Sequence, residues 1–111
     1  MDNPTISVIV PVYQTAQFLD ECLDSIARST LSDIEVLMVD DGSDDGSAAI
    51  CDRKAAEDQR FKCFHRKQAG ISSSRDFGPE QARGQYIAWV DSDDSISKDY
   101  LERLYRAAKT Y

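Results

Sequence analysis

The sequence has little that would suit a disulfide-rich, membrane-spanning or secreted protein. It contains three cysteines in 111 residues, Cys22, Cys51 and Cys63, and no C-x-x-C pair. That spacing favours small buried residues in a reducing cytosol and disfavours a zinc site. No apolar run approaches the ~20 residues that span a bilayer. Residues 1–4 lack the basic and apolar regions of a signal peptide, so we expect one cytoplasmic domain.

Positive charge is also scarce. The chain has 20 acidic and 13 basic residues, a net charge of -7, and no basic stripe. Nucleic acid is therefore not an expected partner. With His65 as the one histidine, no base is placed beside a nucleophile, which excludes a Ser-His-Asp triad. Residues 65–67 are interpreted as an exposed loop with a modest chance of contacting phosphate.

Apolar runs alternate with helical patterns along the chain. Strands are expected at 5–10, ended by Pro11, and at 34–39, 61–64 and 86–90. Helices are expected at 16–29, 48–58 and 72–83, with a closing helix marked by Tyr100, Leu101, Leu104, Tyr105 and Ala108. Thr15 and Ser97 are the expected helix caps, and Pro79 predicts a kink or a restart. This alternation predicts an α/β fold, a Rossmann-like, mostly parallel sheet with flanking helices.

Polar loops follow each expected strand. They begin at Pro11, Asp40, His65 and Asp91. Since parallel sheets bind ligands at the carboxyl ends of their strands, we expect the four loops to converge on one crevice.

The most informative of these loops is Asp91-Ser92-Asp93-Asp94, which directly follows the apolar run 86–90. Three carboxylates this close repel one another unless a cation lies between them. Mg²⁺ and Mn²⁺ prefer such oxygen donors. The alternative is a polar turn that caps the next helix. Its place after a buried strand favours the metal site.

Two other segments offer groups suited to a nucleotide. Asp40 and Asp41 end a strand, where a carboxylate can accept a hydrogen bond from a base N–H or a ribose hydroxyl; residues 44–46 are interpreted as a plain turn. Arg75 offers a planar, permanently charged donor to phosphates, although pairing with Asp76 or another surface acid is equally open. No G-x-G-x-x-G dinucleotide motif is present.

Residues 6–13, 39–46 and 82–94 together resemble the family-2 inverting glycosyltransferases of the GT-A fold, in order and spacing across nearly the whole chain. The resemblance implies a nucleotide-sugar donor, most often a UDP-sugar, and Mn²⁺ or Mg²⁺. By position, it implies that Pro11 and Tyr13 line the base, that Asp41 contacts uracil and that Arg75 lies against the nucleotide. The candidate nucleotide-sugar contacts are then Pro11, Tyr13, Asp40, Asp41, Arg75, Asp91 and Ser92. The candidate metal ligands are Asp93 and Asp94.

The resemblance also implies what lies outside the chain. The family's general base and acceptor pocket are expected beyond Tyr111, so residues 1–111 are expected to be the donor-binding portion of the N-terminal half, truncated before the acceptor half. The expected acceptor is a saccharide or a lipid-linked saccharide at the cytoplasmic face of a membrane, reached through sequence not present here. An uncovered sheet edge would favour self-association.

Two other functions remain open from the sequence. A non-catalytic nucleotide- or metal-binding module makes the same binding predictions without sugar transfer. A phosphoacceptor signalling domain needs a lysine at the end of a late strand, and Lys98 instead falls in the last helical segment.

Overall fold

The computed structural model describes residues 3–67 and 71–110, with the side chains of 71–75 and 110 left aside. Each expected strand and helix is present. In chain order they are β1 (Ile6–Val12), α1 (Ala16–Ala27), β2 (Ile34–Asp41), α2 (Ser47–Glu57), β3 (Phe61–Arg66), α3 (Ile71–Gln81), β4 (Tyr86–Trp89) and α4 (Tyr100–Thr110).

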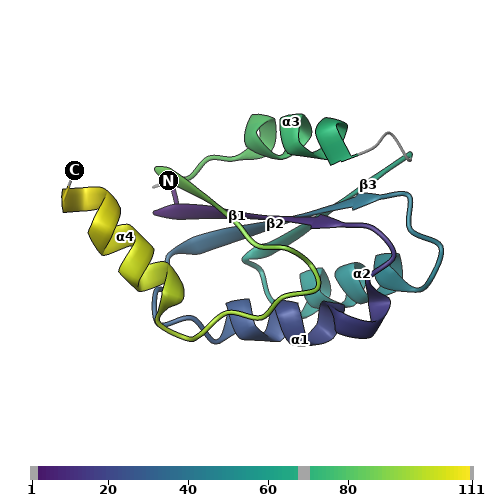
Figure 1. The fold of residues 1–111 in the computed structure, drawn as a ribbon, viewed down its shortest axis with the longest axis horizontal. Coiled ribbons are helices and arrows are strands. Elements are labelled where there is room, and N and C mark those ends of the chain that lie inside the picture. Colours follow the sequence, from purple (N-terminus) through teal and green to yellow (C-terminus); the bar gives the residue numbers. More distant parts are fainter. Residues whose placement is uncertain (1–2, 68–70, 111) are drawn as a thin grey trace.

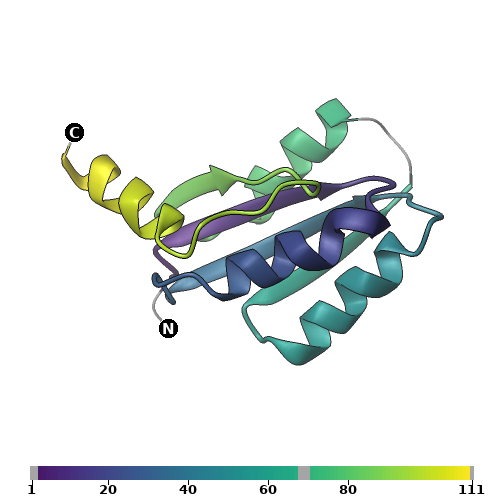
Figure 2. The same cartoon turned by 60° about the horizontal axis from the view of Figure 1, so that its bottom comes forward.

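The four strands form one parallel sheet in the order β3-β2-β1-β4. Helix α3 covers one face, and α1 and α2 cover the other (Figure 1). A second view, with this face turned forward, shows α1 and α2 side by side in front of the sheet (Figure 2). The predicted α/β class with a parallel sheet is therefore confirmed. The strand order reverses at β1, so the topological switch point lies between β1 and β4.

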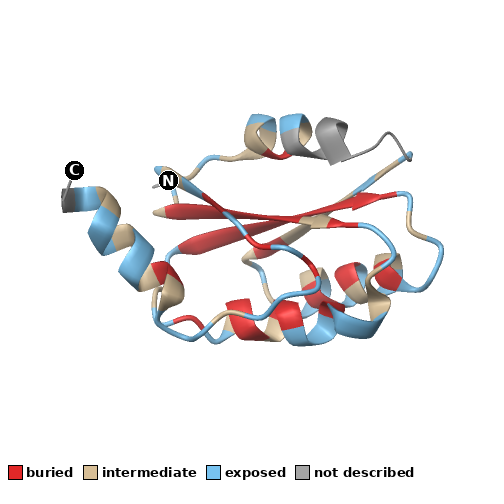
Figure 3. Cartoon of the chain, viewed as in Figure 1, coloured by how far each residue is buried: buried red, intermediate tan, exposed pale blue. Residues whose placement is uncertain are grey.

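The two central strands, β1 and β2, are buried on both faces, which explains their nearly continuous apolar runs. In α1, buried apolar residues recur every three or four positions: Leu19, Cys22, Leu23 and Ile26. They pack against the sheet face that carries Val8, Val10, Val36 and Met38. The α3 face has a smaller cluster of Ile9, Leu37 and Val39, with Phe64 and Phe77 stacked edge to face beside it. Figure 3 shows this concentration of buried residues in the sheet.

The expectation that Pro11 ends the first strand is wrong. Strand β1 continues to Val12 in its pairing with β2, whereas its pairing with β4 stops at Ile9 and Trp89. In a parallel sheet, residues two apart on a strand direct their backbone N–H and C=O groups toward the same neighbouring strand. Ile9 directs these groups toward β4, because its carbonyl accepts the Val90 N–H, and Pro11 therefore has the same orientation. The Pro11 nitrogen therefore faces the region beyond β4, where no ladder bond is lost.

Pro79 does not restart α3, so the expected restart is wrong. The helix runs unbroken from Ile71 to Gln81 with Pro79 in its last turn. Gly78 has a separate role, since a Cβ added there would lie 2.7 Å from Cγ2 of Ile9. The missing side chain lets α3 approach β1 closely.

Neither expected cap acts as a cap. Thr15 occupies the N-cap position of α1 but makes no side-chain capping bond. Asp45 takes that role instead, since its carboxylate accepts the Ala16 N–H at 3.1 Å. It also accepts the N–H and the hydroxyl of Ser47 at the start of α2. Asp45 therefore caps two helices, where a plain turn was expected. Ser97 and Lys98 both lie before α4, so the expectation that Lys98 falls in the last helix is also wrong. The Ser97 hydroxyl donates to Asp99.

The interpretation of residues 65–67 as an exposed loop is wrong for its first two residues. His65 and Arg66 belong to β3, and the guanidinium of Arg66 lies 4.4 Å from the Phe77 ring centroid. Cys22 and Cys51 are buried as expected, whereas Cys63 is half-buried. Gln68, in the loop expected after the third strand, lies outside the described residues.

Strand β4 forms one edge of the sheet, and none of the described strands pairs with its outer side. Ile87 and Trp89 on this strand are 45% and 43% exposed. Helix α4 packs near β4 through Tyr105, whose ring stacks on Tyr86 with centroids 5.9 Å apart. Among the described residues, no helix combines the length and the apolarity needed to cross a bilayer.

Candidate functional site

The loop after β1 is hydrogen-bonded to the loops that follow β2 and β4. The Thr15 hydroxyl donates to Ser92 Oγ at 2.8 Å, and the Thr15 N–H donates to Ser47 Oγ at 3.2 Å. Three of the four expected loops therefore meet at the carboxyl edge of the sheet, as predicted. Thr15 joins them, a role that its sequence context as a helix cap did not reveal.

Gln14 strengthens the same junction. Its φ of 54° is left-handed, a conformation that costs an L-residue about 1–2 kcal/mol. Three hydrogen bonds offset that cost. The side-chain amide donates to Asp44 Oδ1 at 2.7 Å and accepts the Asp44 N–H at 2.8 Å, while the Gln14 N–H donates to Ser43 Oγ at 3.0 Å. No sequence pattern singled out Gln14.

The predicted acidic cluster forms at the end of β4. Asp91, Asp93 and Asp94 are exposed, and each offers a carboxylate oxygen within 4.8 Å of the other two. A turn gathers them, because the Asp94 N–H donates to the Asp91 carbonyl at 3.0 Å. Ser92 points the other way: it is buried and accepts the Thr15 hydroxyl. The polar turn considered as an alternative is therefore present, but it lies well before α4 and does not cap it.

The donor set of this cluster fits a hard divalent cation. Three carboxylate oxygens are ligands that Mn²⁺ and Mg²⁺ accept. No described basic side chain forms an ion pair with Asp91, Asp93 or Asp94. Their negative charge is therefore available to an ion.

Cys22 is buried next to this turn, and the pKa of its thiol responds to the charges of the carboxylates. Its thiol donates to the Asp91 carbonyl at 3.5 Å. Burial, followed by the charges of Asp94, Asp93 and Asp91, raises the pKa of the Cys22 thiol to about 12. The thiol therefore stays protonated and adds no further negative charge beneath the cluster.

The residues expected to bind the nucleotide divide between the two faces of the sheet. Asp41 is on the α3 side with Leu37 and Val39, as side chains alternate along β2. Pro11 shares that side with Ile9 on β1. Tyr13 follows the strand and is 43% exposed. Arg75 belongs to α3, but its side chain lies outside the described residues.

Asp40 faces the opposite side, toward α2. Its Oδ1 accepts the Ser43 N–H at 3.1 Å, and its Oδ2 lies 2.9 Å from Nδ1 of His65. His65 Nε2 lies 2.7 Å from Asp52 Oδ1. These bonds to Asp40 and Asp52 raise the pKa of His65 to about 9. Both Asp40 oxygens are thus engaged within the protein, and contact with a nucleotide stays a prediction for this residue.

A cavity of about 400 Å³ adjoins the acidic cluster, lined by residues from the end of β4 to the start of α4. Its lining includes Trp89, Asp91, Asp94 and Tyr100. Two of the three clustered carboxylates therefore border a space large enough for a small polar ligand.

Comparison with known proteins places this geometry in a family. The profile described as "Glycosyl transferase family 2" matches residues 7–111. The chain is 43% identical over 106 residues to the uncharacterized glycosyltransferase EpsJ of Bacillus subtilis (strain 168), a match that covers 96% of this chain and 31% of EpsJ. The chain thus spans about a third of the length of such relatives.

Two solved structures agree with the fold. The crystal structure of S. aureus TarS 1–349 in complex with UDP-GlcNAc has a TM-score of 0.79 and 32% identity, covering 95% of this chain and 30% of TarS. The mannosyltransferase PcManGT from Pyrobaculum calidifontis, in complex with GDP-Man and Mn²⁺, has a TM-score of 0.81 at 24% identity, covering 97% of this chain and 32% of that one, and shares the fold. From its profile match, its relatives and its architecture, this chain belongs to glycosyl transferase family 2.

Proposed function

We propose that this chain is the donor-binding portion of a glycosyltransferase that uses a nucleotide sugar, namely a UDP-sugar, together with Mn²⁺ or Mg²⁺. One observation carries the proposal. In a chain of family 2, the Asp91, Asp93 and Asp94 carboxylates gather within 4.8 Å of one another at the end of β4. That end of the sheet borders the switch point, where ligands of parallel sheets bind.

In this proposal Asp93 and Asp94 hold the metal ion, and Asp91 contacts the ribose or the sugar. When bound, such an ion neutralises negative charge on the departing diphosphate. The Ser92 hydroxyl serves as a positioning group, since it fixes the turn to Thr15 and thereby aims the three carboxylates outward. The exposed carboxylates thus bind the ion and the donor, and the buried serine holds the turn in place.

The base of the nucleotide is proposed to lie at the ends of β1 and β2. Pro11 and Tyr13 would line it, and Asp41 would accept a hydrogen bond from a uracil N–H. Arg75, on the helix that covers the Asp41 side of the sheet, would contact the nucleotide. TarS, at 32% identity, has a structure with UDP-GlcNAc, which supports a uridine donor here. Asp40 is assigned to positioning, through His65 and the Ser43 turn.

The remaining parts of the proposal concern the whole enzyme. It would transfer the sugar to an acceptor hydroxyl with inversion at the anomeric carbon, using a general base and an acceptor pocket from outside this chain. The acceptor would be a saccharide or a lipid-linked saccharide. A cytoplasmic location, at the inner face of the membrane in the full-length protein, is consistent with three free cysteines.

Calorimetric titration of the chain with UDP tests the donor site. We expect binding in the presence of Mn²⁺ and at least about tenfold weaker binding with a chelator, which corresponds to about 1.4 kcal/mol. The substitution Asp93→Asn should cause a similar loss. Asp99→Asn is the matched control, because Asp99 is also an exposed aspartate but lies outside the cluster, where it pairs with Arg103. Equal UDP affinity with and without Mn²⁺ would contradict the metal-assisted site.

Sugar transfer by the full-length protein separates the enzyme from a non-catalytic binding module. The enzyme is expected to release UDP from a UDP-sugar in the presence of its acceptor, and Asp93→Asn should abolish that release. A full-length protein that binds UDP with Mn²⁺ and transfers no sugar would support the module instead.

A further inference from the structure

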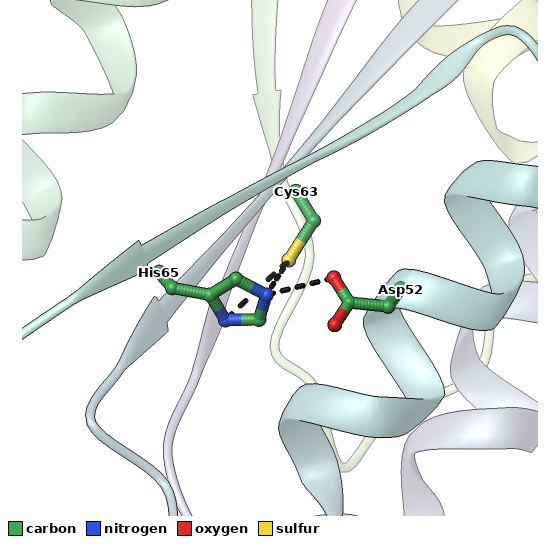
Figure 4. Close-up of side chains that lie close together, drawn as sticks. All are labelled: Asp52, Cys63 and His65. Atoms are coloured by element: carbon green, nitrogen blue, oxygen red, sulfur yellow. Dashed lines mark hydrogen bonds and ion pairs between the residues drawn. The ribbon is translucent and has the colours of Figure 1, made fainter.

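A second cluster of ligand atoms lies on the far edge of the sheet from the acidic turn. Asp52 of α2 and Cys63 and His65 of β3 each offer one ligand atom, all within 4.8 Å of one another (Figure 4). Cys63 and His65 are two positions apart on one strand, so their side chains share a face, and that face is covered by α2. We propose that Asp52, Cys63 and His65 form a binding site for a transition-metal ion of the Zn²⁺ type.

The donor set distinguishes this site from the acidic cluster. A thiolate, an imidazole and a carboxylate are the ligands that Zn²⁺ takes in proteins, whereas Mg²⁺ and Mn²⁺ favour oxygen. In the strand order β3-β2-β1-β4, the new site lies on β3 and the acidic cluster follows β4. The two sites therefore occupy opposite edges of the sheet and suit different metals.

The distances require only local adjustment. Tetrahedral Zn²⁺ with its usual bond lengths separates a sulfur from a nitrogen ligand by about 3.6 Å and a nitrogen from an oxygen ligand by about 3.3 Å. Cys63 Sγ lies 3.5 Å from His65 Nε2. His65 Nε2 and Asp52 Oδ1 are 2.7 Å apart and must separate, which the 64% exposure of the Asp52 side chain permits. Because Sγ is also only 3.9 Å from Nδ1, the ring must tilt to aim Nε2 at the ion.

Asp40 would orient the His65 ligand through the ring nitrogen that does not bind the ion. Its carboxylate, 3% exposed, lies 2.9 Å from Nδ1 of His65 and leaves Nε2 directed toward Asp52. A histidine that binds a metal through one ring nitrogen usually donates the other N–H to a carboxylate or carbonyl in this way. Through the second oxygen of Asp40, the ion would also be linked to Ser43 in the loop after β2. Three protein ligands leave a fourth position for water.

Titration of the reduced, chelator-treated chain with Co²⁺ tests the proposal, because a thiolate bound to Co²⁺ gives an intense charge-transfer absorption that oxygen ligands do not. We expect this absorption in the unmodified chain and its displacement by Zn²⁺. Cys63→Ser should remove the band, and His65→Gln should weaken Co²⁺ affinity at least about tenfold. Circular dichroism of each variant establishes that it is folded.

Two matched variants complete the experiment. Cys22→Ser removes a thiol elsewhere in the chain, and Asp93→Asn alters the acidic cluster; both should keep the absorption band. A folded unmodified chain without the band at millimolar Co²⁺ would overturn the proposal, and so would a band that survives Cys63→Ser. Loss of UDP binding in Asp93→Asn with the band intact would show that the two metal sites are independent.

Discussion

Glu35 provides a stringent test of how the fold positions β4. Its side chain is buried between β1, β3 and the segment before β4. Glu35 Oε2 accepts the Ser7 hydroxyl at 2.6 Å and the Arg83 N–H at 2.7 Å. Ser7 Oγ in turn accepts the Gly84 N–H at 2.7 Å. One carboxylate thus fixes the chain just before β4, and with it the start of the strand that leads to the acidic cluster.

We expect Glu35→Gln to lower the free energy of unfolding by about 2 kcal/mol at neutral pH. The amide oxygen can still accept from Ser7 and Arg83, but each hydrogen bond loses its charge assistance, about 1 kcal/mol apiece. Glu35→Ala should lower the free energy of unfolding by about 3–5 kcal/mol, since it leaves buried hydrogen-bond donors without an acceptor and creates a cavity. Lys62→Ala is the control, expected to cost under about 1 kcal/mol, because Lys62 is 42% exposed and its ammonium lies 3.4 Å from Glu35.

Urea denaturation as a function of pH measures these differences. Burial alone would raise the pKa of Glu35, but hydrogen bonds from Ser7, Arg83 and Lys62 hold that pKa below its ordinary value of 4.5. A lowered pKa means that the carboxylate stabilises the fold above pH 4.5 and that this contribution is lost as pH falls through the lower value in the folded state. The stabilities of the unmodified chain and Glu35→Gln should therefore converge in acid. Equal stability at neutral pH, or a difference that grows in acid, would refute this account.

Three further changes test the surroundings of the site. Gly84→Ala should destabilise the fold by about 2 kcal/mol or more in the same assay, because the new Cβ would lie 2.5 Å from the backbone nitrogen of Ser7; stability within 0.5 kcal/mol would contradict the close approach. Thr15→Val removes the hydroxyl that donates to Ser92 and should cost about 1 kcal/mol and weaken Mn²⁺-dependent UDP binding; unchanged affinity would argue against a role in aiming the turn. Sedimentation should show concentration-dependent self-association through the β4 edge, reduced by Trp89→Lys, and a monomer at every concentration would exclude it.

Much of the fold and of the acidic turn could be predicted from short sequence segments. Unbroken β-branched runs predicted strands covered on both faces, and the three- and four-residue spacing of Leu19, Cys22, Leu23 and Ile26 predicted α1. The run of carboxylates after β4 predicted a cation site from charge repulsion alone. The less accurate predictions concerned Pro11, Thr15 and Pro79, where the cost or benefit of a side chain depends on a neighbour. Pro11 is tolerated within β1 because the adjacent strand has already ended.

The order of residues along the chain therefore determined the alternation of strands and helices and the acidic turn, since each depends on contacts or spacing within a short segment. It also determined the family, through motifs spread over nearly the whole chain. Only the tertiary structure decided that Asp40 meets His65 on the α2 side of the sheet, and that Asp52 meets Cys63 and His65. It also decided that Glu35 holds the segment before β4. Such pairings join residues 11 to 48 positions apart, and no local pattern encodes them because strand register and helix packing bring them together.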